Sequence, residues 1–354
     1  AQLLQLVQQA VQMGKKSGAD EVFASSTKNR EVRIKMRDGK VETVKEAVSN
    51  SLSVRIWSQG RYGVHRSNDL RPNQLQRFIE DAVMLTRAVQ PDTHRQITDP
   101  ALYENRPADD LNLHDPKVHD LTREERLKIC LEQNETLMGS PQMISTSSGV
   151  SDTSSISAKA SSNGFGDTQM KTSFWFGSDI TLKDKGDKKP KGWMWAGARH
   201  RTDTPEVSSV AKLTLKRAQA MLGAQKGPSK KTLMVVDPYA ATQLVSRLLR
   251  PANGRSFSQS QSFWKGKIGK KTVADQLHIT DDPLLKRGLA SRRYDGDGIS
   301  AKSMTVIEGG VLNNIYVDTY YGSKLNMPPT TGGKSNLILN TGERSLDAIL
   351  ADCP

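Results

Sequence analysis

The sequence predicts a multi-domain α+β protein, in which N-terminal domains of helices and antiparallel sheet precede a β-rich C-terminal domain. The prediction depends on apolar residues that recur at helical spacing in several separate segments, and on alternating apolar and polar residues between those segments. A chain of 354 residues is also longer than one typical domain. The mean hydropathy of −0.57 is typical of a soluble globular chain.

Residues 1–90 are expected to form an N-terminal α+β domain. Apolar residues at helical spacing begin at Leu3, and Gly18 ends this first helix. Short alternating segments follow, and Asp38-Gly39 between two of them is a strong hairpin signal. A second amphipathic helix is expected over about Asn73–Gln90.

Residues 91–120 are rich in proline and aspartate, and we expect an irregular linker there. The linker contains His114 and His119, each followed by an aspartate. Their separation fits neither the spacing of a helix face nor that of a strand, and Pro116 between them disfavours a helix. We therefore favour a chance pairing in a loop over a pair of metal ligands.

Residues 121–225 are expected to form a middle domain of helices and antiparallel strands. Thr122 and Glu125 have the spacing of a capping box, which starts a helix that runs to about Met138. Strands rich in serine and threonine follow, with a turn at SNGFG, and a further helix is expected over 206–222. The tryptophans on the strands either pack against a neighbouring layer or form an interaction surface: Trp175, Trp193 and Trp195.

Residues 226–354 are expected to form the β-rich C-terminal domain. A helix is expected over Tyr239–Arg250, before a loop rich in serine and glutamine. The predicted strands are TLMVVD at 232–237, TVADQLHITDDP at 272–283, and two strands joined at Glu308-Gly309-Gly310, followed by a helical tail.

The formal net charge of +13 would suit a nucleic-acid ligand. However, the densest basic clusters contain glycine, have the composition of solvated loops, and are not accompanied by any known nucleic-acid-binding pattern. We therefore expect no nucleic-acid partner. No apolar run has the length of a membrane span and the N-terminus lacks the apolar core of a signal peptide, so we expect no membrane partner and a cytoplasmic location.

The residues alone indicate no catalytic constellation. The patterns HExxH, GxSxG, Walker A and GxGxxG are absent. Two cysteines cannot build a disulfide framework or a cysteine-based zinc site, and Cys130 has the surroundings of a core residue. The pair Asp281-Asp282 could serve metal or acid–base chemistry, and Asp295 and Asp297 weakly match a calcium loop, but we favour turn chemistry for Asp281-Asp282.

Four longer strings carry a resemblance to a known family. They are MRDGKVETV (36–44), SSNGF (161–165), the stretch FWKGKIG…YDGDGIS (263–300) and VIEGGVLNNIYVDTYYGSKLN (306–326). With the order of segments, they resemble the TldD/PmbA family of metalloproteases, also labelled modulators of DNA gyrase. The resemblance implies that the α+β domains end in a C-terminal domain of the TldD/PmbA type.

The same resemblance implies that the zinc-binding positions are vacated in this chain. TldD-type members carry HExxxH just before the F-x-x-G-x-x-G stretch, where two histidines and a C-terminal cysteine bind zinc and the glutamate is the base. Counting back from residues 263–269 places Val245, Ser246 and Arg250 at the first histidine, the glutamate and the second histidine. None of these side chains can do that chemistry, and no histidine or glutamate occurs from 233 to 276.

This departure matches the PmbA/TldE branch, the partner subunit without its own metal. The resemblance then implies no catalytic and no metal-binding residue in this chain, zinc in a TldD-type partner, and an extended peptide substrate held as an added strand. Family chains continue beyond GERSLDAILADCP, so we expect that the end of the C-terminal domain is missing and do not assign the cysteine ligand to Cys353. Candidate peptide or partner contacts are Arg247, Asn253, Ser258, Gln259, Gln261 and Asp295.

The expected function is therefore that of a non-catalytic subunit in a TldD/TldE-like heterodimer that degrades unfolded peptides or removes leader peptides. Three alternatives stay open. The chain could be a stand-alone homodimeric module that binds peptides, or a nucleic-acid-associated, gyrase-modulating factor. It could also be a hydrolase that uses unrecognised residues such as Asp281, Asp282 or Asp295.

Overall fold

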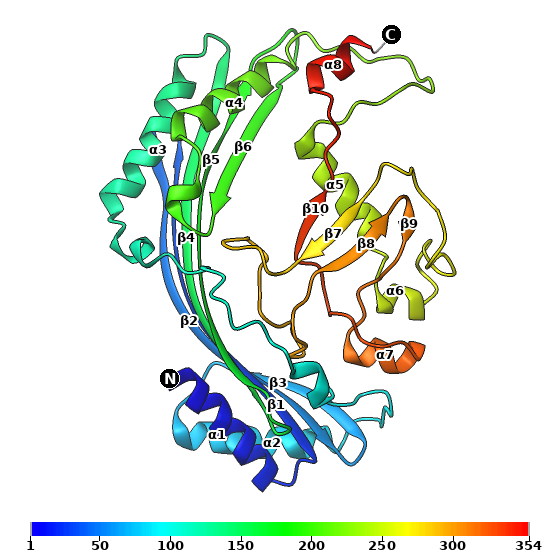
Figure 1. The fold of residues 1–354 in the computed structure, drawn as a ribbon. Helices are drawn as coiled ribbons and strands as arrows, with labels where there is room; N and C mark the ends of the chain where they lie inside the picture. Colours follow the sequence, from blue (N-terminus) through cyan, green and yellow to red (C-terminus); the bar gives the residue numbers. More distant parts are fainter. Residues whose placement is uncertain (1, 353–354) are drawn as a thin grey trace.

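The fold is dominated by one long, curved antiparallel sheet (Figure 1). The structure is a computed structural model that describes residues 2–352, so Cys353 lies outside the described residues. Within that range the large sheet has six strands in the order β3-β2-β1-β4-β5-β6. The strands are β1 (Glu21–Arg37), β2 (Lys40–Ser58), β3 (Arg61–Ser67), β4 (Met143–Ser161), β5 (Gly166–Leu182) and β6 (Lys191–Ala198).

The large sheet joins two segments that the sequence analysis treated as separate domains. β1 to β3 come from residues 1–90 and β4 to β6 from residues 121–225, and β1 pairs directly with β4. The predicted hairpin at Asp38-Gly39 connects β1 to β2, and both of its residues have positive φ, as a tight hairpin turn requires. The predicted turn at SNGFG connects β4 to β5. The pairing between the two halves was not foreseen.

Alternation along the strands separates two chemically different faces. Even-numbered residues of β1, β2 and β4, such as Ala24, Val54 and Ala158, are buried under helices. Odd-numbered residues of the same strands, such as Arg55 and Lys159, point toward the C-terminal region, defined here as residues 226–352. That region lies against the concave side of the curved sheet (Figure 1).

One end of the sheet is covered by α1 (Gln2–Lys16) and α2 (Pro72–Thr86). Both helices were predicted, and each places an apolar stripe on the even-numbered face. The shared core contains Val7, Ala10, Leu75, Ile79, Val22, Val54 and Ala160, among others. These side chains are almost completely buried, and burial of each valine, leucine or isoleucine side chain contributes about 1.5–3 kcal/mol to the hydrophobic stabilisation of this end.

The other end is covered by α3 (Arg123–Met138) and α4 (Val207–Gln219). The predicted capping box is present, with the side chains of Thr122 and Glu125 each bonded to the other residue's backbone N–H. Cys130 is fully buried between α3 and the sheet, as predicted for a core residue.

A buried ion pair fixes α3 to the sheet. The Arg126 guanidinium donates to both carboxylate oxygens of Asp152 on β4, at 2.6 and 3.0 Å, and both side chains are almost fully buried. Two-point contact between a planar guanidinium and a carboxylate is the strongest form of this interaction. The pair therefore sets the position of α3 along β4.

The predicted linker between α2 and α3 is irregular apart from two short 3-10 turns, η1 (Pro100–Tyr103) and η2 (Pro116–Asp120). It is nevertheless packed, because Tyr103, Leu111, Leu113 and Val118 are buried. The linker extends between the large sheet and the C-terminal region (Figure 1).

The C-terminal region contains a small sheet in the order β10-β7-β8-β9, as far as residues 2–352 show it. Its elements are α5 (Pro238–Leu249), α6 (Gly254–Ser258), β7 (Ile279–Asp282), β8 (Met304–Glu308), β9 (Val311–Leu312), α7 (Thr319–Leu325), β10 (Asn336–Leu339) and α8 (Leu346–Ala351). The predicted helix before Arg250, the strand pair joined at Glu308-Gly309-Gly310 and the helical tail are confirmed.

Of the predicted strands in this region, one is wrong and another is too long. TLMVVD at 232–237 forms no strand; Leu233 and Met234 are mostly exposed, and no described strand lies beside them to accept ladder hydrogen bonds. In 272–283 only β7 is strand. The first half of the 272–283 segment forms a turn at Ala274–Leu277, where the Leu277 N–H donates to the Ala274 carbonyl.

Across residues 2–352, no helix has both the length and the apolar character needed to cross a bilayer.

We predict that Asp152→Ala lowers the free energy of unfolding by about 3–5 kcal/mol, because it leaves the Arg126 charge buried without a partner. Urea denaturation of the full chain measures this loss. Asp275→Ala is the matched control, since it breaks an ion pair with Lys271 in which both side chains are more than half exposed. A loss in Asp152→Ala no larger than that of the control would contradict the assigned role of the buried pair.

Candidate functional site

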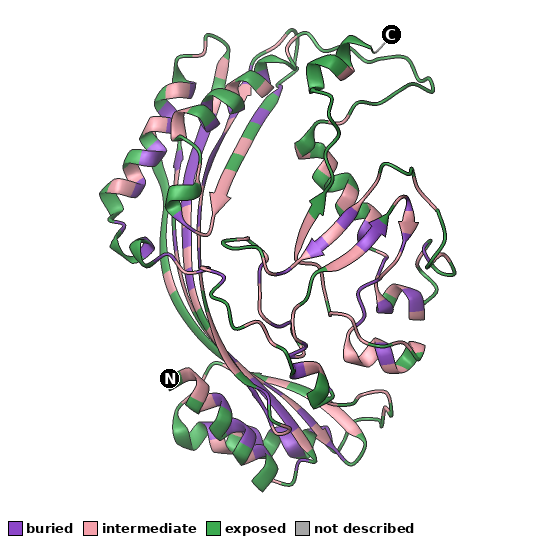
Figure 2. Cartoon of the chain, viewed as in Figure 1, coloured by how far each residue is buried: buried purple, intermediate pink, exposed green. Residues whose placement is uncertain are grey.

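The helix that the resemblance equates with the zinc helix is α5. The Asp237 side chain caps its N-terminus by accepting a hydrogen bond from the Ala240 N–H, and Figure 2 shows most of the helix exposed. Val245 is half-buried against the core of the C-terminal region, whereas Ser246 and Arg250 are exposed. Val245 therefore has a packing role, and α5 carries no histidine, cysteine or carboxylate that could bind a metal.

Most of the predicted peptide or partner contacts lie on the surface beyond α5. Arg247, Gln259 and Gln261 are exposed and Ser258 is half-buried. Asn253 has a local structural role, because its side chain caps α6 through the Ser256 N–H at 3.0 Å and donates to the Arg250 carbonyl at 2.6 Å.

The loop after α6 is held to α5 by a buried tryptophan. Trp264 is fully buried and its indole N–H donates to the Leu248 carbonyl at 2.8 Å. On the other side of α5, Tyr239 meets Trp193 of β6 edge to face, with ring centroids 5.2 Å apart. One of the tryptophans noted in the sequence thus lies where the large sheet and α5 meet.

The histidine pair of the linker does come together, but without further ligands. The rings of His114 and His119 have centroids 5.9 Å apart, and His119 Nε2 lies 3.1 Å from Ser154 Oγ. Over residues 2–352 no group of three or more histidine, cysteine, aspartate or glutamate side chains has an arrangement that could hold a metal ion.

The aspartate pair Asp281-Asp282 has local structural partners. Asp281 is buried on β7 and accepts hydrogen bonds from Tyr316 Oη and the Ser335 N–H, both at 2.8 Å. Asp282 accepts from the Leu284 N–H two residues further on, which is turn chemistry.

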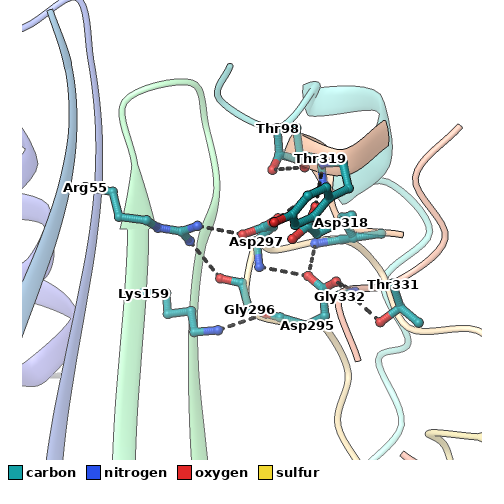
Figure 3. Close-up of polar contacts among 12 residues, drawn as sticks. Arg55, Thr98, Lys159, Asp295, Gly296, Asp297, Asp318, Thr319, Thr331 and Gly332 are labelled. Atoms are coloured by element: carbon teal, nitrogen blue, oxygen red, sulfur yellow. Dashed lines mark hydrogen bonds and ion pairs between the residues drawn. The ribbon is translucent and has the colours of Figure 1, made fainter. Parts of the chain in front are cut away.

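Six charged side chains line a cavity of about 620 Å³ between the large sheet and the C-terminal region, named here the polar cavity. The sheet contributes odd-numbered residues of β1, β4 and β5, which are Thr27, Ser155, Ser157, Lys159, Gln169 and Lys171. The C-terminal region contributes Arg292, Tyr294, Asp295, Gly296, Asp297, Asp318, Gly332 and Gly333. Figure 3 shows the acidic side of this cavity.

Asp295, a predicted contact residue, organises the loop that closes the polar cavity. Its buried carboxylate accepts hydrogen bonds from the N–H groups of Asp297, Ile299 and Gly332 at 2.7 to 3.0 Å, and from Thr331 Oγ1 at 3.3 Å (Figure 3). Burial, and secondarily the negative charge of Asp297, raise the pKa of the Asp295 carboxyl.

The other two carboxylates of the cavity, Asp297 and Asp318, also have partners within the protein. Asp297 pairs with Arg55 of β2 at 2.6 Å, and Arg55 also donates to the Gly296 carbonyl at 2.7 Å and lies 4.0 Å from the centre of the Phe23 ring. Asp318 caps α7 by accepting from the Tyr321 N–H at 2.7 Å. The Arg55 contacts fasten the loop to the large sheet.

Two of the three cations that line the polar cavity have neutral partners instead. Lys159 Nζ donates to the Asp295 backbone carbonyl at 2.8 Å, and Arg292 donates to the Lys334 and Gly333 carbonyls and to Thr331 Oγ1. Lys171 donates to no acceptor within residues 2–352. Sequence analysis missed these residues, although lysines at odd positions among alternating serines and threonines were a usable signal.

The surroundings disfavour the protonated form of both lysines. Burial lowers the pKa of Lys171 to about 8, and the positive charges of Arg199, Arg292 and Lys159 act in the same direction. Burial also lowers the pKa of Lys159 to about 8, although the negative charge of Asp295 partly opposes it.

The comparisons with known proteins agree with this architecture. Residues 229–354 match the PmbA/TldA metallopeptidase C-terminal domain, and residues 21–86 match PmbA/TldA metallopeptidase domain 1. The fold and these two matches place the chain among proteins built from PmbA/TldA metallopeptidase domains. It belongs to the TldD/PmbA family, as the resemblance predicted.

Two curated relatives are similar over most of the chain. The metalloprotease PmbA of Escherichia coli O157:H7 is 25% identical over 327 residues, which is 91% of this chain and 71% of the relative. A metalloprotease PmbA homolog of Haemophilus influenzae is 24% identical over 341 residues, covering 96% of this chain and 75% of the relative.

Solved structures show the same fold. A protein of Bacteroides thetaiotaomicron, described as a modulator of DNA gyrase, superposes with a TM-score of 0.95 at 28% identity, covering 99% of this chain and 79% of that one. TldE of Thermococcus kodakarensis superposes with a TM-score of 0.78 at 16% identity, covering 98% and 80%, which is a likeness of fold alone.

We predict that Lys171→Met makes the chain more stable near neutral pH and that this advantage shrinks as pH rises. The folded-state pKa of about 8 lies below the ordinary value of 10.5, so the unfolded chain binds more protons between these values and wild-type stability rises with pH there. Urea denaturation at a series of pH values measures the difference.

Lys28→Met is the matched control, because Lys28 is an exposed lysine of β1 on the opposite face from Thr27. Its stability difference from wild type should stay constant across the same pH interval. A difference for Lys171→Met that stays constant or grows with pH would contradict the assigned surroundings of Lys171.

Proposed function

We propose that this chain is the non-catalytic PmbA/TldE-type subunit of a cytoplasmic heterodimer whose TldD-type partner holds zinc and cleaves peptides. The observation that carries the proposal is the chemistry of α5. At the three positions that the family resemblance equates with HExxxH, this chain has Val245, Ser246 and Arg250.

Each of these side chains is unsuited to a zinc site for a different reason. Val245 has no donor atom and its side chain packs against the C-terminal core. Ser246 is a poor general base at neutral pH. Arg250 stays protonated and would repel Zn²⁺. The zinc and its catalytic base are therefore assigned to the partner subunit.

The substrates proposed for the heterodimer are extended peptides, either unfolded segments or leader peptides, bound as an added strand. The names of the curated relatives support a proteolytic assembly, since both are called metalloproteases. The fold likeness to a TldE supports the family and leaves the subunit role to the chemistry of α5.

We predict that the isolated chain neither retains stoichiometric zinc nor hydrolyses an unstructured peptide such as β-casein fragments, whereas co-expression with a TldD-type subunit from the same genome gives a zinc-dependent peptidase. Size-exclusion chromatography, metal analysis by mass spectrometry and a peptide-cleavage assay measure the three properties.

The matched control replaces the glutamate of HExxxH in the TldD-type subunit by alanine. This change should abolish cleavage without dissociating the complex. Zinc-dependent cleavage by the isolated chain would overturn the proposal. A stable homodimer that ignores the TldD-type subunit would favour the stand-alone peptide-binding alternative instead.

A further inference from the structure

We propose that the polar cavity of this chain binds the C-terminal carboxylate of a peptide. The inference rests on the proposed function only in taking the ligand to be a peptide. The anionic character of the ligand follows from the cavity itself.

Within residues 2–352, three positively charged side chains of the polar cavity form no ion pair. Lys159, Lys171 and Arg292 line the cavity, and none of them has an ion-pair partner among the described residues. Arg199, which also acts on Lys171, donates only to backbone carbonyls. Partly buried cations without counter-charges destabilise a fold, and a bound anion removes that cost.

The neighbouring carboxylates are held by other partners and form no ion pair with these three cations. Asp295 is surrounded by hydrogen-bond donors of its own loop, Asp297 is paired with Arg55, and Asp318 caps a helix. Their lone pairs are directed to these fixed partners. No described residue accepts a hydrogen bond from Lys171, so its acceptor is water or a ligand.

Neutral hydrogen-bond donors line the sheet side of the polar cavity. Ser155 pairs in register with Lys171, and Ser157 lies in the next row between Thr27 and Gln169. The serine hydroxyls make only long contacts of 3.5 and 3.4 Å to backbone carbonyls, so they can rotate toward a ligand. Hydroxyl, amide and ammonium donors on a rigid sheet are suited to carboxylate oxygens.

The size of the cavity favours a peptide terminus over a free inorganic anion. A volume of about 620 Å³ lies within the range of roughly 300–1,000 Å³ that accommodates organic ligands. A phosphate ion would leave most of that space to water, whereas the last residues of an extended chain would occupy it.

The test uses the full chain and a pair of probes that differ only in charge: N-acetyl-tetra-alanine with a free C-terminus and its C-terminal amide. Isothermal titration calorimetry gives Kd for each. The free acid should bind wild type at least about tenfold more tightly than the amide, the factor expected for charge-assisted hydrogen bonds. In Lys171→Met this preference should fall to about twofold or less, while Lys28→Met should keep the wild-type preference.

The ratio of the two Kd values is measured on the wild-type chain, so the test does not depend on whether Lys171→Met folds. Circular dichroism shows whether that variant is folded. Equal binding of the two probes, or no binding of either at roughly 10 mM, overturns the inference. An equal loss of preference in Lys28→Met overturns the role of Lys171. If inorganic phosphate displaces the acid at the same concentration, the cavity takes free anions and the peptide assignment is wrong.

The outcome is separable from that of the proposed function. Assembly with a TldD-type subunit together with equal binding of acid and amide would leave the heterodimer intact and overturn only the carboxylate site. Carboxylate preference without assembly would leave the site intact and overturn only the subunit role.

Discussion

The pairing of β1 with β4 is the constraint on which the rest of the structure depends. The two strands come from distant parts of the chain, yet they run in one antiparallel register from Phe23 opposite Ser161 to Arg37 opposite Ser147. Because side chains alternate between faces, a slip by one residue would move Lys159 under the helices and Ala158 into the polar cavity. The register therefore decides which residues form the core and which face the C-terminal region.

The two faces of the large sheet differ in whether their cations are in ion pairs. On the helix face a deeply buried cation, Arg126, is paired with Asp152. On the concave face Lys159 and Lys171 form no ion pair within residues 2–352, while nearby carboxylates hold the C-terminal loops in place. The helix face pairs its buried cation, whereas the concave face does not pair its lysines. This difference indicates that the concave face is shaped to bind a ligand rather than to maximise stability.

Local signals in the sequence predicted local structure well. The Asp38-Gly39 hairpin, the Thr122/Glu125 capping box and the strand pair at Glu308-Gly310 depend only on neighbouring residues, and all three are confirmed. The run at 232–237 was mistaken for a strand because apolar content says nothing about whether a partner strand is available. The polar cavity could not be predicted, since it needs the β1–β4 register and the docking of the C-terminal loops, and both depend on contacts between residues far apart in sequence.

The central claim is that α5 is a zinc helix without its ligands, in a chain that acts beside a metal-bearing partner. The most direct measurement is anomalous X-ray diffraction at the zinc absorption edge from crystals of the complex with a TldD-type subunit. We expect one peak per heterodimer, beside the HExxxH helix of the partner subunit. A peak beside Val245 and Arg250 of this chain would contradict it.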